Sequence, residues 1–131
     1  MTIYAFEDED SVRALYERVA VLAKVPFKTF EDPSHLKGLN LDEIASTFTD
    51  VAGVITDREM PGMSGTELID LLRKAGYKKP IVLITGGLRA EELDGLREKY
   101  LRAYPGTDTV VKPKPVEIKD LREMMQRWLA Q

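Results

Sequence analysis

The sequence contains no cysteine, and it has only one histidine and one tryptophan. The lack of cysteine excludes a disulfide framework, a thiolate metal site and a cysteine nucleophile, and it fits a reducing compartment. No apolar run approaches the roughly 20 residues that a membrane-spanning helix needs. The first six residues have no basic region of a signal peptide and lead into four acids. We therefore expect a cytoplasmic protein with no membrane association.

The charge balance argues against binding to polyanions. There are 19 lysines and arginines and 22 acidic residues, which gives a formal net charge of -3. Such a chain has no general attraction to nucleic acid or to an anionic membrane, so we expect neither as a direct partner. The 131 residues, 44 % of them hydrophobic, are predicted to form one domain spanning 1–131.

Short apolar runs alternate with segments of helical periodicity along the whole chain. Asn40 with Glu43 three residues on predicts a helix N-cap, and Ser64 with Glu67 has the spacing of a capping box. Pro26 interrupts the second apolar run and favours an edge position for it. The predicted strands are 3–6, 25–30, 51–56, 81–84 and 109–111, and the predicted helices are 12–23, 40–47, 64–76, 89–103 and 118–129.

This alternation predicts an α/β fold of the flavodoxin-like, doubly wound (βα)5 type. Its parallel five-stranded sheet would have the order 2-1-3-4-5 with helices on both faces. In the last helix, Met124 and Trp128 are expected to pack inward. His35 is predicted to lie exposed in a loop. In the first helix, a stripe of apolar residues is expected to be buried. The predicted stripe consists of Val12, Leu15, Tyr16, Val19, Leu22 and Ala23.

Acidic residues follow two strands that would be neighbours in this sheet. Glu7 and Asp8 come after the first strand, and Asp57 comes after the third. Functional sites in such sheets lie beyond the carboxyl ends of the strands, so the three carboxylates should converge. Two carboxylates about 4 Å apart repel by roughly 4 kcal/mol at an effective dielectric constant of 20. The cluster must stay partly protonated or hold a cation, and Mg²⁺ suits hard oxygen ligands best.

Polar residues at the other strand ends fit phosphoryl transfer. A carboxylate such as Asp57 can accept a phosphoryl group as an acyl phosphate. Thr85 follows the fourth strand, and its hydroxyl can donate to a phosphoryl oxygen, while Gly86 leaves space beside it. The fifth strand runs into Lys112-Pro113, and a lysine supplies a point charge for another oxygen.

With these elements in this order, the chain resembles the receiver (CheY-like) domains of two-component response regulators. The matching residues are Glu7-Asp8, Asp57 with Met60-Pro61-Gly62 and Gly65, Thr85-Gly86, and Lys112-Pro113. The resemblance implies that Asp57 accepts phosphate from the phosphohistidine of a sensor histidine kinase or phosphotransfer protein. It also implies that Mg²⁺ is held by Glu7, Asp8, Asp57 and the backbone carbonyl of Glu59. Thr85 would move inward, and Lys112 would pair with the phosphoryl group. The resemblance also implies that the Lys112–Pro113 peptide bond is cis.

The resemblance further implies a signalling switch that catalyses only its own phosphorylation and dephosphorylation. Its fourth helix, fifth strand and fifth helix would then bind a downstream protein or a second copy. Three features depart from the family pattern. Thr109 stands where relatives carry an aromatic residue three positions before the lysine, and Lys114 follows Pro113 where many carry phenylalanine. The segment 31–50 is longer than is typical.

Two rival functions use the same fold. A pseudo-receiver would bind a partner without being phosphorylated, and the residue at 109 leaves room for it. A flavin-binding or hydrolytic enzyme is disfavoured because the four acids at 7–10 would repel a flavin phosphate. A haloacid-dehalogenase-type phosphatase is disfavoured as well. Such an enzyme needs a cap domain and a second acid two residues after its nucleophile, and Glu59 at that position is the wrong type of acid.

Overall fold

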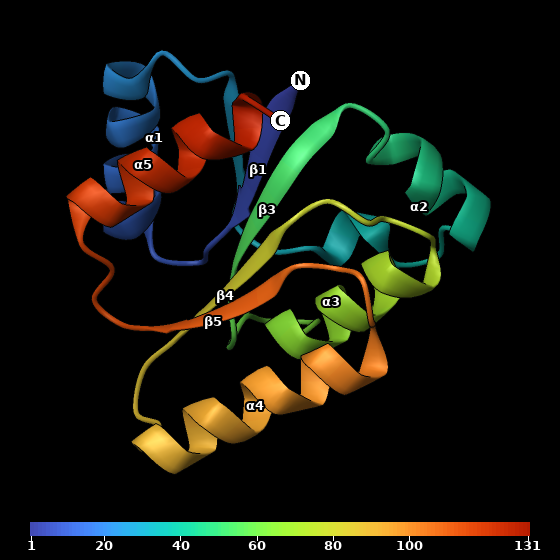
Figure 1. Ribbon diagram of the computed structural model, residues 1–131. Coiled ribbons are helices and arrows are strands. Elements are labelled where there is room, and N and C mark those ends of the chain that lie inside the picture. Colours follow the sequence, from blue (N-terminus) through green and yellow to red (C-terminus); the bar gives the residue numbers. More distant parts are fainter.

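A computed structural model describes residues 1–131, in which five parallel strands form one sheet in the order β2-β1-β3-β4-β5. This confirms the predicted flavodoxin-like α/β fold and strand order. Figure 1 shows the strands fanning through the middle of the molecule with helices on both sides. The strands are β1 (Thr2–Phe6), β2 (Phe27–Phe30), β3 (Val51–Asp57), β4 (Ile81–Thr85) and β5 (Thr109–Pro113).

The helices divide into two layers that cover opposite faces of the sheet. α1 and α5 pack on one face, and α2, α3 and α4 pack on the other. None of the helices combines the length and the apolar character that a bilayer crossing requires. The helices are α1 (Asp10–Ala23), α2 (Leu41–Thr47), α3 (Gly65–Lys74), α4 (Ala90–Ala103) and α5 (Ile118–Leu129), with a 3₁₀ turn at Ser34–Leu36.

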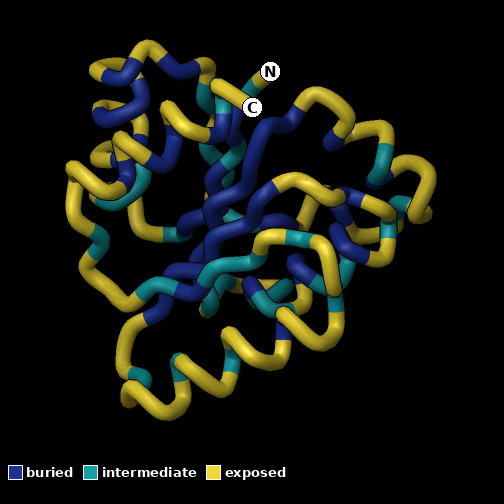
Figure 2. The backbone as a smooth tube through the Cα atoms, in the orientation of Figure 1, coloured by how far each residue is buried: buried dark blue, intermediate teal, exposed yellow.

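The central strands are buried along their whole length because helices cover both faces of the sheet. Every residue of β3 and β4 is buried, which explains why their sequences show no polar alternation. Figure 2 shows this buried centre and the exposed outer sides of the helices. Trp128 and Met124 are each only 3 % exposed, as predicted for residues of the packed side of α5.

Local sequence signals set the N-terminal ends of α2 and α3 where they were predicted. The side chain of Asn40 accepts the backbone N–H of Glu43, and that of Ser64 accepts the backbone N–H of Glu67. Both pairs form the reciprocal capping box. After α3 the chain turns through Gly76 at φ 89°, a conformation that glycine adopts without the steric cost of a side chain.

The predicted stripe on α1 was wrong at two positions. Leu15 is 38 % exposed and Leu22 is 61 % exposed, because the six predicted residues span a wider arc of the helix than the sheet and α5 cover. The expected loop 31–40 contains the 3₁₀ turn. There His35 is exposed as predicted, but its ring stacks on that of Phe30 with the centroids 4.8 Å apart.

Two glycines should respond in opposite directions to alanine. A Cβ on Gly53 in β3 would lie 2.1 Å from the Trp128 ring, whereas one on Gly95 in α4 would meet nothing within 4 Å. We expect Gly53→Ala to lower the free energy of unfolding by about 1–3 kcal/mol through overpacking. Gly95→Ala should raise it by about 0.5–1 kcal/mol through helix propensity. Urea unfolding measures both, and a Gly53→Ala protein as stable as the wild type would refute the packing.

Candidate functional site

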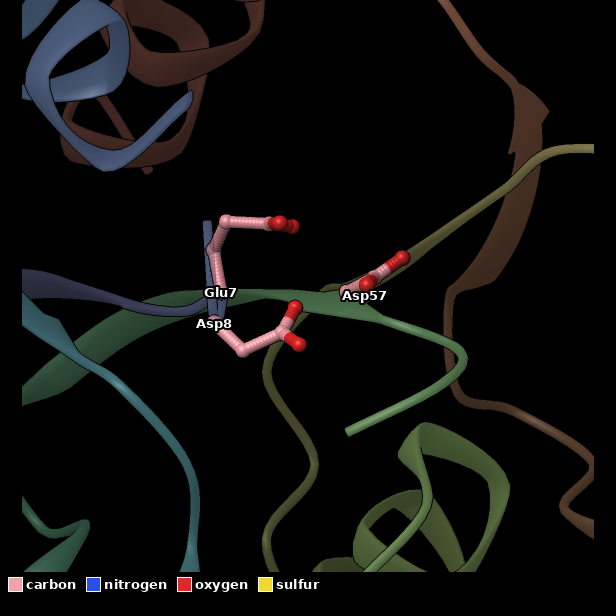
Figure 3. Close-up of side chains that lie close together, drawn as sticks. All are labelled: Glu7, Asp8 and Asp57. Carbon is pink, nitrogen blue, oxygen red and sulfur yellow. The ribbon is translucent and has the colours of Figure 1, made fainter. Parts of the chain in front are cut away.

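Three carboxyl groups meet at the carboxyl edge of the sheet. Glu7 and Asp8 directly follow β1, and Asp57 is the last residue of β3. β1 and β3 are paired in register up to Phe6 and Thr56, which brings these residues together. One carboxylate oxygen from each of the three lies within 4.8 Å of the others. Figure 3 shows the side chains of Glu7 and Asp8 reaching from the end of β1 toward Asp57.

Glu7 is the most deeply buried of the three acids. It is 0 % exposed, and its Oε2 has no hydrogen-bond partner, while Oε1 accepts the backbone N–H of Glu9 at 3.3 Å. Burial, and then the negative charge of Asp57, raise the pKa of Glu7 to about 7. At neutral pH the carboxyl group of Glu7 therefore lies near the midpoint of its titration.

The cluster fits a small hard cation. It offers three carboxylates, and a buried carboxylate oxygen without a partner is a costly group that a cation would satisfy. Glu59 lines the same cleft, as its predicted role as a backbone carbonyl ligand requires. The residues present thus match the requirements of a bound Mg²⁺.

The lysine of the site is Lys114, and the prediction of Lys112 was wrong. The Nζ of Lys114 lies 2.9 Å from Oδ1 of Asp57. Lys112 instead lies within β5, in register with Ile84, where it borders a shallow depression that Glu117 also lines. The cis peptide bond is likewise Lys114–Pro115 and not Lys112–Pro113.

The physical reason for this error is the length of β5. The strand continues through Pro113, two residues beyond the predicted end at Val111, so Lys114 is the first residue past the sheet. Residues two apart share a face of a strand, so alternation alone does not separate the two lysines of Lys112-Pro113-Lys114-Pro115. The position three before the lysine becomes Val111 rather than Thr109, and it is still not aromatic.

The ion pair between Asp57 and Lys114 is partly shielded from water. Burial raises the pKa of Asp57, although Lys114 and the backbone N–H of Arg58, which donates to Oδ1 at 3.0 Å, both lower it. Burial lowers the pKa of Lys114, but its hydrogen bond to Asp57 and the charge of that residue outweigh the burial, and the pKa is raised overall. The pair therefore favours the charged ammonium beside Asp57.

Thr85 is the last residue of β4, one residue beyond the predicted end of this strand, and it lines the cleft with Asp57 as predicted. It is 3 % exposed, and its hydroxyl donates to the Gly86 carbonyl in a long contact of 3.4 Å. The Thr85 carbonyl accepts the backbone N–H of Lys114 at 2.9 Å, which fixes the two residues to one another. The hydroxyl thus lies at the rim of the site in a weak contact that a stronger acceptor could replace.

A polar cleft of about 390 Å³ encloses these groups, and no hydrophobic side chain lines it. Its composition suits an anion held between a bound cation and the Lys114 ammonium. Sequence reasoning missed Arg58 and Glu9 in this lining, because neither has a motif that sets it apart from a surface residue. The lining residues are Asp8, Glu9, Asp57, Arg58, Glu59, Thr85, Gly86 and Lys114.

Comparison with solved structures shows which known fold this is. The receiver domain of the Francisella response regulator 1452 superposes with a TM-score of 0.75, at 15 % identity, over 98 % of this chain and 96 % of that one. The chemotaxis protein CheY4 of Vibrio cholerae superposes with a TM-score of 0.66, at 22 % identity, over 96 % of each chain. The fold is that of a response-regulator receiver domain.

Sequence comparison with curated proteins finds a relative that this chain matches over only part of the relative's length. The sequence of this chain is 26 % identical over 128 residues to that of the DNA-binding transcriptional regulator NtrC of Escherichia coli K12. The match covers 98 % of this chain and 24 % of the regulator, so the chain spans about a quarter of the length of the curated relatives it matches. No protein-family model matches the chain.

The acidic cluster should make stability depend on pH when divalent cations are absent. The folded chain binds a proton at Glu7 more tightly than the unfolded chain does, since its pKa is about 7 against an ordinary 4.5. This contribution to stability is complete below the ordinary pKa and is lost as the pH rises through about 7. Burial raises the pKa of Asp57 too, which acts in the same direction. We expect the free energy of unfolding to fall by on the order of 3 kcal/mol between pH 5 and pH 8.

Chemical denaturation in chelator across this pH range provides the measurement. Glu7→Gln should flatten most of the slope, whereas Glu123→Gln, an exposed carboxyl on α5 without an ion pair, should leave it unchanged. Equal slopes in the wild type and Glu7→Gln would contradict the burial of this carboxyl group.

The two lysines should differ in their effect on Asp57. Because Lys114, and not Lys112, contacts the carboxylate, Lys114→Ala should raise the pKa of Asp57, and Lys112→Ala should leave it where it is. Titration of the Asp57 side-chain carboxyl carbon by NMR measures this pKa directly. A shift of the same size in both variants would show that neither ammonium is specifically paired with Asp57.

Proposed function

We propose that this chain is a phosphoacceptor switch of a two-component system. Asp57 would receive a phosphoryl group from the phosphohistidine of a sensor histidine kinase or of a phosphotransfer protein. The observation that carries the proposal is the ion pair between Asp57 and Lys114 at 2.9 Å, beside two further carboxylates and inside a wholly polar cleft. A solved structure of similar fold, 24 % identical with a TM-score of 0.66, is the receiver domain of the hybrid histidine kinase CckA.

The transfer needs one bond to form and one to break. A carboxylate oxygen of Asp57 forms the new P–O bond while the P–N bond to the donor imidazole breaks, and the released nitrogen keeps the electron pair. Lys114 neutralises a phosphoryl oxygen, and the Thr85 hydroxyl exchanges its weak contact with Gly86 for another oxygen. Bound Mg²⁺, held by Glu7, Asp8, Asp57 and the Glu59 carbonyl, would supply further charge neutralisation.

The same site would remove the phosphoryl group by hydrolysis: a water oxygen forms a new P–O bond, the P–O bond to Asp57 breaks, and the Asp57 carboxylate and inorganic phosphate are released. The chain is then a regulatory phosphoacceptor and not an enzyme that turns over an external substrate. Output would leave through α4, β5 and α5, which bind a downstream protein or a second copy. This choice is supported by the chain path, because β4 leads from Thr85 into α4 and Lys114 joins β5 to α5.

Labelling with a small phosphodonor tests the proposal. With acetyl phosphate and Mg²⁺, the intact mass of the wild type should rise by one phosphoryl group, and Asp57→Asn should show no such adduct. Lys114→Ala should slow labelling by about a hundredfold, the scale for losing one charge-stabilising donor. Lys112→Ala should label at the wild-type rate. Labelling of Asp57→Asn equal to that of the wild type would overturn the assignment of the acceptor.

One observation favours the alternative of a pseudo-receiver. Val111 occupies the position where an aromatic residue of the family switch is expected, three residues before the lysine. A binding module held in one state would give no phosphoryl adduct under any Mg²⁺ concentration. Partner binding would then be the same for the wild type and Asp57→Asn.

A further inference from the structure

The four successive acids at 7–10 have different surroundings. Glu7 is buried and Asp8 is half-buried, and both belong to the carboxyl cluster. Glu9 is the N-cap residue of α1, but its side chain makes no capping hydrogen bond and lines the cleft instead. Asp10 belongs neither to the cluster nor to the cleft lining, and its side chain is 92 % exposed. The turn between β1 and α1 thus lacks the side-chain cap that usually holds the start of a helix.

Arg13 supplies a different connection across this turn. Its Nη1 donates to the backbone carbonyl of Glu7 at 2.7 Å, and its Nη2 donates to the carboxylate of Asp10. The Arg13 side chain is only 18 % exposed. Its backbone N–H donates to the Glu9 carbonyl at 3.0 Å in the first turn of α1. The guanidinium therefore reaches back to the end of β1 from a fixed position on the helix.

The carbonyl that Arg13 holds belongs to the peptide group between Glu7 and Asp8. Because a peptide group is planar, fixing its carbonyl restricts the directions in which both side chains leave the backbone. A second hydrogen bond within the turn, from the backbone N–H of Glu9 to Oε1 of Glu7, is longer at 3.3 Å. A short bond from a charged donor is the stronger of the two. Arg13 thus orients two of the three acids without contacting their carboxylates.

The pairing of Arg13 with Asp10 has two effects. It orients the guanidinium, and it holds the fourth acid of the run outside the cluster. The number and rigidity of the oxygen ligands decide between divalent cations. Ca²⁺ takes roughly six to eight oxygens in flexible geometry, whereas Mg²⁺ requires nearly ideal octahedral geometry with fewer ligands. A small, rigidly held set of carboxylates therefore favours Mg²⁺ over Ca²⁺.

We propose that Arg13 is a positioning residue for the metal site, and that it sets the preference of this site for Mg²⁺ over Ca²⁺. By holding the Glu7 carbonyl and Asp10, it keeps Glu7 and Asp8 in the arrangement that Mg²⁺ requires. This inference rests on the Mg²⁺ site of the proposed function and adds to it a residue from outside the cleft. Groups that orient metal ligands in this way change metal affinity by about ten- to a hundredfold when they are removed.

Calorimetric titration of the full chain with Mg²⁺, and separately with Ca²⁺, tests the role of Arg13. Arg13→Met keeps an unbranched apolar side chain and removes the donors. It should weaken Mg²⁺ binding about tenfold and Ca²⁺ binding less, so that the preference for Mg²⁺ falls. Arg18→Met is the matched control, because Arg18 is an exposed arginine of the same helix without an ion pair. Both variants lose one positive charge, which by itself would strengthen cation binding. Weaker binding in Arg13→Met alone is therefore a loss of positioning.

Equal Mg²⁺ affinity in Arg13→Met and Arg18→Met, or an unchanged preference for Mg²⁺ over Ca²⁺, would overturn the role of Arg13. Urea unfolding shows whether the variants fold. If Arg13→Met does not fold, Arg13→Lys is compared with Arg18→Lys. It should bind Mg²⁺ more weakly, because an ammonium lacks the planar fork that reaches the Glu7 carbonyl and Asp10 together. Equal affinities in that pair would also overturn the proposal.

The same titrations separate this inference from the proposed function. A wild type that binds no Mg²⁺ would overturn the metal site of the proposed function and the role of Arg13 together. Binding by the wild type that does not depend on Arg13 would overturn the role of Arg13 alone. Failure of Asp57 to label with acetyl phosphate would overturn phosphoryl transfer alone, since Mg²⁺ binding is measured without a phosphodonor.

Discussion

The repulsion among three carboxyl groups at one edge of the sheet is the constraint on which the other features of this site depend. Glu7, Asp8 and Asp57 bring oxygens within 4.8 Å of one another, and two of the three residues are buried. Like charges so close and so dehydrated cannot all persist without compensation. The chain supplies one ammonium, that of Lys114, and the remaining deficit is met by a proton on Glu7 or by a bound cation.

The fold creates this constraint through the order of its strands. Because β1 lies between β2 and β3, the acids after β1 fall beside the acid that ends β3. The pairing of β4 with β5 places Thr85 and Lys114 on the other side of Asp57. The same strands lead into α4 and α5. Arg97 of α4 donates to the backbone carbonyl of Val111 in β5, so α4 and β5 are also joined by a side-chain contact.

Sequence patterns predicted those parts of the structure that depend on short-range signals. The alternation of strands and helices and the caps at Asn40 and Ser64 follow from apolar periodicity and local spacing. The meeting of Glu7 with Asp57 follows from the edge rule of parallel sheets once the order 2-1-3-4-5 of a flavodoxin-like fold is taken. The lysine was missed because two Lys–Pro pairs follow one another, and only the length of β5, which depends on pairing with β4, selects Lys114. Exposure of Leu22 was missed because helix periodicity does not report how wide a contact the partner surface makes.

Calorimetric titration of the chain with Mg²⁺ near pH 7, in two buffers of different ionisation enthalpy, tests the central claim most directly. If the acids compete for a proton and a cation, each binding event releases a fraction of a proton from Glu7, whose pKa is about 7. The apparent binding enthalpy then differs between buffers in the wild type, and the difference disappears in Glu7→Gln. Binding without any buffer dependence in the wild type, or no binding at all, would contradict the account.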